Sequence, residues 1–416
     1  MKLKLPEKAS MEFEKELGLI FPNIEPEVKE IPLDKRPIGK DKIHVCEPYI
    51  GRLEKKYIHN VVESGWVSSL GPEVKKFEKE FADVMEVNYA ISCTSGTTAL
   101  HLCLAAFGIG PGDEVILPTF TMIATINAVM YCGATPVLVD ANDHLNIDVN
   151  KIEEKVTEKT KVIMPVHIYG FPCELNKIVE IANKYNLLVV EDVAESHCAY
   201  YKGKMVGGFG DISAYSMYAN KLLTCGEGGM ITTNDEDVAE RVRTLMNHAF
   251  SPERHFCHRL LGYNYRMTAL QAALGRAQLS KLKEMVEKRI MMRNAYIRNL
   301  EGEKHIVVIN HPHEADISPT CWMFGIMLTP REGVKKNLVR KMLADKGIET
   351  RNFFVPMHLQ PVHYERFKGQ RYPKAEEYME TGFYLPSATE ITMSEIDYIS
   401  ENLIKITNKV YGEEDD

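Results

Sequence analysis

The sequence lacks a long apolar run, an excess of basic residues and the apolar core of a signal peptide. None of its 416 residues belongs to a stretch apolar enough to span a bilayer, and residues 1–6 lead straight into charged sequence. The formal net charge of −8 excludes a general nucleic-acid binder, because such proteins displace phosphate counterions with basic side chains. We therefore expect a cytoplasmic protein that binds neither membrane nor nucleic acid.

Closely spaced cysteine pairs are also missing. The 9 cysteines are scattered, and no two of them form a CxxC pair. Reduced, unpaired thiols are the expectation, and neither a structural zinc site nor any other metal is expected. A GxGxxG turn after the first expected strand is absent too, which argues against a nicotinamide dehydrogenase.

The length predicts more than one structural unit. A chain of 416 residues exceeds what one hydrophobic core usually organises, so we expect a large and a small domain. Residues 1–40 are charged and contain several prolines, which indicates an N-terminal extension, either packed on the surface or partly disordered. We place the large domain at residues 41–285 and a smaller α+β domain at 286–416, and expect the acidic residues 413–416 to be a plain charged end.

Short apolar runs alternate with helix-like segments. Leu53, Tyr57, Ile58 and Val61 share one helical face, and residues 268–300 repeat apolar side chains like one long helix that links the two domains. The short runs are rich in Val and Ile and lie at residues 114–117, 136–139, 162–166 and 187–190. This alternation predicts an α/β fold whose mostly parallel central sheet has helices on both faces.

Ligands of such sheets bind beyond the carboxyl ends of the strands. Residues 118–121, 167–170 and 192–195 follow three of the apolar runs, so we expect them to lie together at one rim of the sheet.

The first motif that could carry chemistry is a turn of small and hydroxyl residues at positions 92–101. It reads as a strand end, a turn around Gly96 and the start of a helix. Free backbone N–H groups at a helix start, helped by hydroxyls, can cradle a phosphate, although an ordinary helix cap has the same pattern.

The second motif is the acidic segment 191–195, in which Asp192 and Glu195 follow a buried strand. A carboxylate there could keep a pyridine nitrogen protonated, which pyridoxal phosphate needs to act as an electron sink. The alternative is a helix cap made by Asp192.

The third motif is an apolar strand at 213–219 followed by Lys221 and a glycine-rich turn at 226–229. A lysine in partly apolar surroundings loses its charge more easily and can bond an aldehyde, whereas a surface lysine is the alternative. Phosphate cradle, acid and lysine together are what pyridoxal phosphate demands.

With these motifs the chain resembles the DegT/DnrJ/EryC1/StrS family of pyridoxal-phosphate sugar aminotransferases, which have the type I aminotransferase fold. The matching stretches run from residue 64 to about 386. Within this family the chain is most similar to the perosamine-synthase-type members, which aminate carbon four of a nucleotide-linked 4-keto-6-deoxy sugar. The segments that carry this similarity are 65–69, 165–170, 262–268 and 347–354.

The resemblance implies a role for each matching residue. Lys221 would bond the cofactor and move the proton, Asp192 would pair with the ring nitrogen, and Glu195 would lie near the ring hydroxyl. The phosphate would be held by Gly96, Thr97, Ser216 and, from a neighbouring subunit, Asn264, so the implied assembly is a homodimer with shared sites. Segments near the sugar or nucleotide contribute Trp66, Ser68, His167, Arg351 and Phe353.

Three features depart from the family pattern. Met122 stands where relatives usually have an aromatic residue over the cofactor ring, a place its polarisable sulfur can fill. Residues 215–220 differ from many relatives, which have Phe and Gly there. The extension at 1–40 is absent from most of them.

The implied reaction transfers an amino group from glutamate to the keto sugar, with pyridoxamine 5′-phosphate as the second cofactor form. Two alternatives remain. One is a dehydratase that removes a sugar hydroxyl, although relatives of that kind have histidine at the position of Lys221. The other is a regulator that binds the cofactor without turnover. The nucleotide (GDP, UDP or dTDP), the sugar's configuration and the choice between carbons three and four stay open.

Overall fold

The computed structural model describes residues 42–251, 254, 256–309, 317–332 and 336–412. The extension expected at residues 1–40 and the acidic end at 413–416 lie outside the described residues. Among the helices of the described chain, none has both the length and the apolar character that crossing a bilayer requires.

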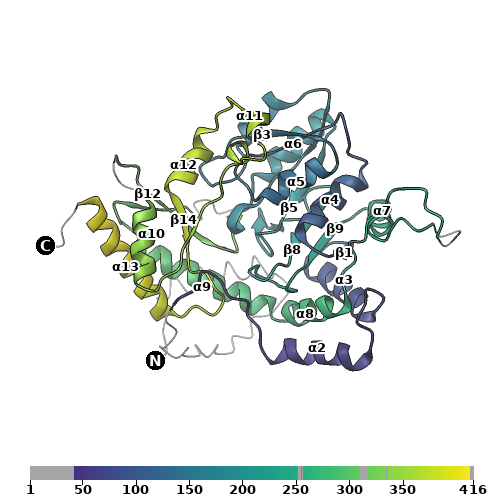
Figure 1. Ribbon diagram of the computed structural model, residues 1–416, viewed down its shortest axis with the longest axis horizontal. Helices are drawn as coiled ribbons and strands as arrows, with labels where there is room; N and C mark the ends of the chain where they lie inside the picture. Colours follow the sequence, from purple (N-terminus) through teal and green to yellow (C-terminus); the bar gives the residue numbers. More distant parts are fainter. Residues whose placement is uncertain (1–41, 252–253, 255, 310–316, 333–335, 413–416) are drawn as a thin grey trace.

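A seven-stranded sheet forms the centre of the larger part (Figure 1). In spatial order its strands are β1 (Tyr89–Cys93), β9 (Gly229–Thr233), β8 (Ile212–Ser216), β5 (Leu188–Asp192), β4 (Thr160–Ile163), β2 (Glu114–Pro118) and β3 (Thr135–Val139). The pairs from β8 to β3 are parallel, and β9 pairs antiparallel with both of its neighbours, β1 and β8. The mostly parallel sheet is confirmed, and the four apolar runs are strands β2 to β5.

Each face of this sheet has its own apolar core, because neighbouring strand residues point to opposite faces. Val115 and Leu117 of β2 face α4 (Gly96–Ala106), α5 (Ile123–Tyr131) and α7 (Glu236–Met246), whereas Ile116 faces the other core. That second core includes α3 (Pro72–Val84) and α6 (Leu175–Tyr185). The helices on both faces are those the alternating pattern predicts.

The smaller part is an antiparallel sheet with its own core of buried residues. Its strands, in order, are β10 (Ile306–Val308), β12 (Phe324–Leu328), β14 (Gly382–Leu385) and β13 (Arg351–Asn352). Helices α10 (Lys336–Asp345) and α13 (Met393–Tyr411) pack on it beside α9 (Leu282–Leu300) (Figure 1). The α+β character expected of this part is confirmed.

The single long helix expected at residues 268–300 is wrong, because the structure divides it into α8 (Ala269–Leu279) and α9 (Leu282–Leu300). The Ser280 hydroxyl donates to the Ala277 carbonyl at 2.8 Å, and Lys281 has φ −108° and ψ 4°, outside helical geometry. Met285 in the first half of α9 packs in a core of the large sheet, and Tyr296 packs in the small one. The predicted domain boundary at residue 285 falls inside this helix and stays a prediction.

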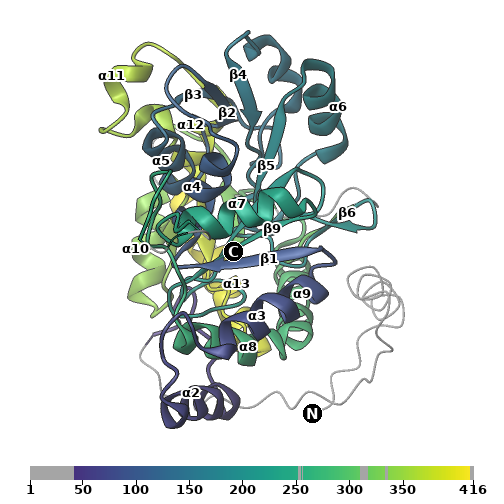
Figure 2. The same cartoon turned by 90° about the vertical axis from the view of Figure 1, so that its right-hand side faces the viewer.

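The other elements are short or lie at the periphery. Figure 2 shows α3 and α8 side by side below the end of the sheet that carries β1, next to α2. The remaining bounds are α2 (Arg52–Ser64), η1 (Val149–Lys151), η2 (Glu153–Lys155), η3 (Ile168–Gly170), β6 (Tyr200–Tyr201), β7 (Lys204–Met205), β11 (Ile317–Ser318), η4 (Met357–Leu359), α11 (Tyr364–Phe367) and α12 (Pro373–Thr381).

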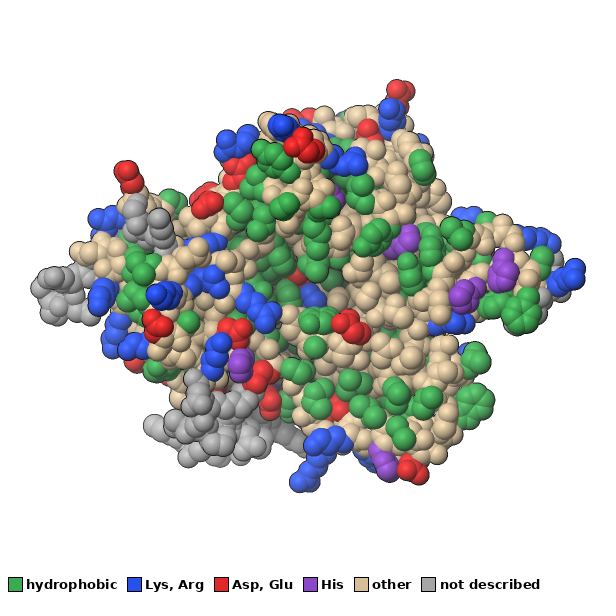
Figure 3. Space-filling model, in the orientation of Figure 1, with side chains coloured by type: hydrophobic (Ala, Val, Ile, Leu, Met, Phe, Trp, Pro, Cys, Tyr) green, Lys and Arg blue, Asp and Glu red, His purple; other side chains and the backbone are tan. Residues whose placement is uncertain are grey.

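The described residues of segment 247–265 (247–251, 254 and 256–265), which we call the arm, follow α7 and project from the body. Apolar and histidine side chains gather on it at the right of Figure 3. Phe256, Leu260 and Leu261 are 77%, 56% and 84% exposed there.

Candidate active site

Lys221 lies in the turn that follows β8, with only 10% of its side chain exposed. Its Nζ is 3.5 Å from Glu195 Oε1 and 3.5 Å from the centroid of the Trp322 ring. Burial lowers the pKa of Lys221, against the opposing charges of Glu195 and Asp192. A buried lysine with a lowered pKa reaches its neutral, nucleophilic form more readily than one in water.

Asp192 is the last residue of β5 and is 4% exposed. Its carboxylate accepts hydrogen bonds from Thr125 Oγ1 at 2.8 Å and from the Ala194 N–H at 3.1 Å. Burial raises the pKa of Asp192, and these two bonds and the charge of Lys221 counteract that effect. A buried carboxylate of this kind is suited to a cationic partner such as a protonated ring nitrogen.

Glu195 shares the rim with Asp192. Its Oε2 accepts the N–H of Tyr169 at 2.9 Å, while its Oε1 faces Lys221. Burial raises the pKa of Glu195 as well, against the charge of Lys221. The acid motif and the lysine motif, far apart in the sequence, therefore meet as predicted.

The phosphate motif is in contact with the end of β8. Ser95 caps α4, accepting the Thr98 N–H at 3.2 Å, so the N–H groups of Gly96 and Thr97 begin the helix without an intrahelical acceptor. A Cβ atom on Gly96 would lie 2.7 Å from the Cβ of Ser216. Only glycine allows this approach, which brings the helix start and the Ser216 hydroxyl to one place.

Met122 and Asn264 occupy more open positions. Met122 is 45% exposed at the N-cap of α5, where its sulfur accepts the Ala124 N–H at 3.0 Å. It lies one helical turn before Thr125, the partner of Asp192. Asn264 is exposed at the base of the arm and accepts Arg266 Nε at 3.1 Å. Their roles at the cofactor stay predictions.

The structure does not support a substrate contact for the side chains of His167 and Phe353. His167 is fully buried, with Nδ1 accepting the Cys173 N–H at 3.0 Å and Nε2 3.2 Å from Glu191. Phe353 is 2% exposed and fills the space left by Gly325 and Gly382. His167 lies in a rim segment and Phe353 directly follows β13 of the small sheet, but both side chains point into the core, an orientation that their spacing did not reveal.

Trp66, Ser68 and Arg351 remain available for a substrate. Trp66 is 57% exposed after α2, and Ser68 is exposed nearby. The side chain of Arg351 is 48% exposed on β13, 3.9 Å from Glu349. Their roles stay predictions.

Sequence reasoning missed four residues of this site, namely Thr125, Tyr169, His197 and Trp322. Burial lowers the pKa of His197 to about 3, with Lys221 adding to the effect, so its ring is neutral. Two hints were present: Tyr169 lies in the rim segment 167–170, and Thr125 lies in the first turn of the helix that follows the rim segment 118–121.

The residues present fit pyridoxal phosphate. The group combines a buried amine, a buried acid for a ring nitrogen and a helix start that only glycine leaves open. Among the buried side-chain atoms of the described residues that have no hydrogen-bond partner, His197 Nε2 and Asn220 Oδ1 belong to residues near Lys221. Buried polar atoms are normally satisfied, so partners from a bound molecule would complete them.

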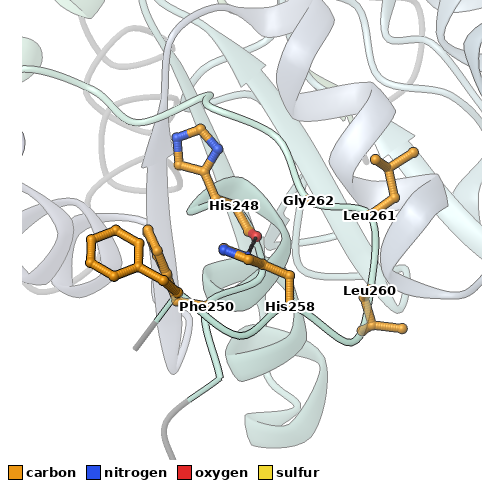
Figure 4. Close-up of a pocket in the computed structure, with 7 residues that line it drawn as sticks. His248, Phe250, His258, Leu260, Leu261 and Gly262 are labelled. Atoms are coloured by element: carbon orange, nitrogen blue, oxygen red, sulfur yellow. Dashed lines mark hydrogen bonds between the residues drawn. The ribbon is translucent and has the colours of Figure 1, made fainter. Parts of the chain in front are cut away.

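A separate hollow of about 340 Å³ lies on the arm (Figure 4). It is lined by His248, Phe250, Phe256, His258, Leu260, Leu261 and Gly262. A hydrogen bond joins His258 Nδ1 to the His248 carbonyl at 2.7 Å. The lining offers mainly apolar surface, because Phe250, Phe256, Leu260 and Leu261 form much of it.

Comparison with known proteins gives matches over nearly all of the described chain. The sequence model of the DegT/DnrJ/EryC1/StrS aminotransferase family matches residues 48–404. The GDP-perosamine synthase of Escherichia coli O157:H7 is 41% identical over 362 residues, which are 87% of this chain and 97% of that protein. The GDP-perosamine synthase of Caulobacter vibrioides is 42% identical over 362 residues, covering 86% and 96%.

A solved structure has the same fold. A proposed sugar aminotransferase of Streptococcus pneumoniae, solved in PLP and PMP forms, superposes with a TM-score of 0.82 at 26% identity. The match covers 89% of this chain and 99% of that one.

Proposed function

Since the chain belongs to the DegT/DnrJ/EryC1/StrS aminotransferase family, we propose that it transfers an amino group from glutamate to carbon four of a GDP-linked 4-keto-6-deoxy sugar. The broader class is established: the protein is a pyridoxal-phosphate-dependent sugar-nucleotide aminotransferase with the type I fold. The resemblance to two GDP-perosamine synthases supports the choice of GDP and of carbon four. The product would be a 4-amino-4,6-dideoxy sugar nucleotide for polysaccharide biosynthesis.

The observation that carries the catalytic assignment is the position of Lys221. Its Nζ is 3.5 Å from Glu195, and Asp192 is close enough to influence its pKa. When bound, pyridoxal phosphate supplies an electron-withdrawing ring that stabilises negative charge on the adjacent carbon. Lys221 Nζ would accept a proton from that carbon and pass it to the sugar carbon, and such acid–base help is typically worth about 10²–10⁴-fold in rate.

The other residues bind and orient. Asp192, held by Thr125, would keep the ring nitrogen protonated, and Glu195 would lie near the ring hydroxyl. The helix start at Gly96 and Thr97, with Ser216, would hold the phosphate. Met122 would cover the ring, and Asn264 would reach the phosphate from a second subunit, so we propose a homodimer with shared sites.

The substrate is tested directly. Purified protein is mixed with glutamate and GDP-4-keto-6-deoxymannose, and both 2-oxoglutarate and the amino sugar nucleotide are quantified. The amination site follows from the NMR spectrum of the product. UDP- and dTDP-linked 4-keto sugars serve as competitors, and a higher kcat/KM with either would contradict the choice of GDP.

The same assay separates the two alternatives. A dehydratase would release a deoxygenated keto sugar, and a cofactor-binding regulator would form no 2-oxoglutarate. Lys221→Ala should abolish turnover and the absorbance band of the lysine-bound cofactor. Lys204→Ala, an exposed lysine elsewhere on the same part of the chain, is the matched control.

A further inference from the structure

The amine of Lys221 lies between partners that come from the two different sheets. Glu195 follows β5 of the large sheet, whereas Trp322 comes just before β12 of the small sheet. The ring of Trp322 is nearly buried, at 5% exposure, and stands 3.5 Å from Nζ. A cation over a desolvated indole face is stabilised by the ring's quadrupole, so this face favours the charged form of the amine.

Trp322 also holds the backbone that carries the lysine. Its Nε1 donates to the carbonyl of Asn220, the residue just before Lys221, at 2.7 Å. The thiol of Cys46 donates to the same carbonyl at 3.2 Å. Arg289, 1% exposed on α9, donates from Nη1 to the Trp322 carbonyl at 2.8 Å. The indole is therefore fixed through its ring nitrogen and through its backbone.

The backbone of Tyr169 forms hydrogen bonds with both partners of Lys221, Glu195 and Trp322. Its N–H donates to Glu195 at 2.9 Å, and its carbonyl accepts the N–H of Trp322 at 3.0 Å. Tyr169 has φ 53°, and the next residue, Gly170, has φ 94°. A Cβ on Gly170 would lie 2.6 Å from the Cys321 nitrogen, so glycine is needed for the two segments to meet.

We propose that Trp322 is a positioning residue for Lys221, whose free ammonium it holds on its ring face opposite Glu195 while its N–H fixes the peptide before the lysine. This rests on the proposed function, in which Lys221 alternates between a cofactor-bonded and a free state. In the free state the amine needs a defined place from which it can return to the reacting carbon. The ring of Trp322 and the carboxylate of Glu195 supply that place.

The test measures the ionisation of the free lysine rather than turnover. Cofactor-stripped full-length protein is mixed with pyridoxal phosphate at a series of pH values, and the rate at which the band of the lysine-bound cofactor grows is recorded. Only the neutral amine attacks the aldehyde, so the pH midpoint reports the pKa of free Lys221. Because the ring stabilises the ammonium, Trp322→Leu should move the midpoint to lower pH by about 0.5–1.5 units.

Trp322→Phe keeps a ring face but loses the N–H that binds Asn220, so it should give a smaller shift in the same direction. It also serves if the leucine variant folds poorly. Phe324→Leu, which removes another buried ring two residues further on, is the matched control and should leave the midpoint in place. An unchanged or higher midpoint in both Trp322 variants, or an equal shift in the control, overturns the proposal.

Failure of the proposed function would look different. If the Lys221→Ala variant still showed the absorbance band of a lysine-bound cofactor, Lys221 would not be the lysine that bonds the cofactor. If that variant stays colourless while the Trp322 variants keep the original midpoint, only the positioning role fails.

Discussion

At the scale of single residues, the site depends on charges kept where water cannot reach them. Lys221, Asp192 and Glu195 are almost completely buried. Burial lowers the pKa of Lys221 and raises the pKa of Asp192 and of Glu195, so it favours the neutral form of each side chain. Hydrogen bonds and mutual attraction work against this effect. The balance among them, more than any single group, sets the pH range over which the amine and the acids can serve transamination.

Thr125→Val should weaken cofactor retention and shift the acidic limb of the rate profile. The threonine hydroxyl donates to Asp192 at 2.8 Å, which stabilises the carboxylate and lowers its pKa. Without this bond the pKa of Asp192 rises further, so the carboxylate is protonated, and activity lost, at a higher pH than in the wild type. A hydrogen bond to a charged group contributes about 1.5–3 kcal/mol, so retention should fall about 10–100-fold.

The measurement is the dissociation constant of pyridoxal phosphate together with kcat/KM from pH 5 to 9. Thr125→Ser keeps the hydroxyl and should restore both quantities. An equal loss in the serine and valine variants would mean that packing, and not the hydrogen bond, is responsible.

The sequence predicted those site residues that come directly after a strand. It did not predict the residues that the fold brings to the site from distant parts of the chain. Asp192 follows a short apolar run, Lys221 follows an apolar strand, and Gly96 stands in a turn between a strand end and a helix, so the three motifs could be connected through the needs of one cofactor. Trp322 reaches Lys221 from a different sheet, and no spacing in the sequence indicates that approach. His167 stands at the rim by sequence, yet its two hydrogen bonds turn the ring inward.

At the scale of elements, the start of α4 and the end of β8 are joined through Gly96. An alanine there would bring its Cβ to 2.7 Å from the Cβ of Ser216, so the helix start must move away from the strand. Gly96→Ala should therefore lower the affinity for pyridoxal phosphate and for free phosphate by more than Ser216→Ala, which removes only one hydroxyl.

The measurement is cofactor binding by titration of the stripped protein. Gly110→Ala is the control, because a Cβ there would meet nothing closer than 3.8 Å. Normal affinity in Gly96→Ala would show that the helix start does not hold the phosphate.

Another contact between elements attaches α12 to the end of β3. Tyr372, the N-cap of α12, makes no side-chain cap, and Asp140 from the large sheet serves instead. Its carboxylate accepts the N–H groups of Ala375 at 3.0 Å and Lys374 at 3.3 Å. Removing such a cap typically costs about 1 kcal/mol, up to about 2, so Asp140→Ala should lower the melting temperature.

Asp140→Asn keeps an acceptor oxygen and should lose much less. Differential scanning fluorimetry of the three proteins at one concentration compares them. Equal melting temperatures for Asp140→Ala and the wild type would show that α12 is held by its apolar contacts alone.

At the scale of the whole molecule, the site lies where the two sheets meet. Helix α9 contributes to the cores of both parts, and Arg289 on that helix binds the backbone of Trp322. The sequence pattern, from which we expected a domain boundary at residue 285, does not show that α9 packs in two cores. An amphipathic helix has the same pattern whether it packs against one core or against two. The parts are thus coupled through the residues next to the catalytic lysine.

The proposed homodimer with shared sites makes a quantitative prediction about mixed subunits. Asn264 is exposed near the end of the arm, and in the proposed dimer its side chain reaches the phosphate of the neighbouring subunit. Lys221→Ala should be inactive, and Asn264→Ala should retain about 1–10% of the activity, because one hydrogen bond to an anion is lost. When the two variants are mixed, a hybrid dimer has one site with both residues intact and one with neither.

Random reassembly of equal amounts makes half of the dimers hybrid, so activity should recover to about a quarter of the wild-type value. The variants are unfolded together and refolded, and kcat is compared with the same proteins refolded separately. Asn264 acting within its own subunit would give no recovery, because every hybrid site would then lack one of the two residues. Adding Leu261→Asp to both variants places a charge on the most exposed apolar side chain among the described residues of the arm. If the arm forms the dimer contact, this change should also prevent the recovery.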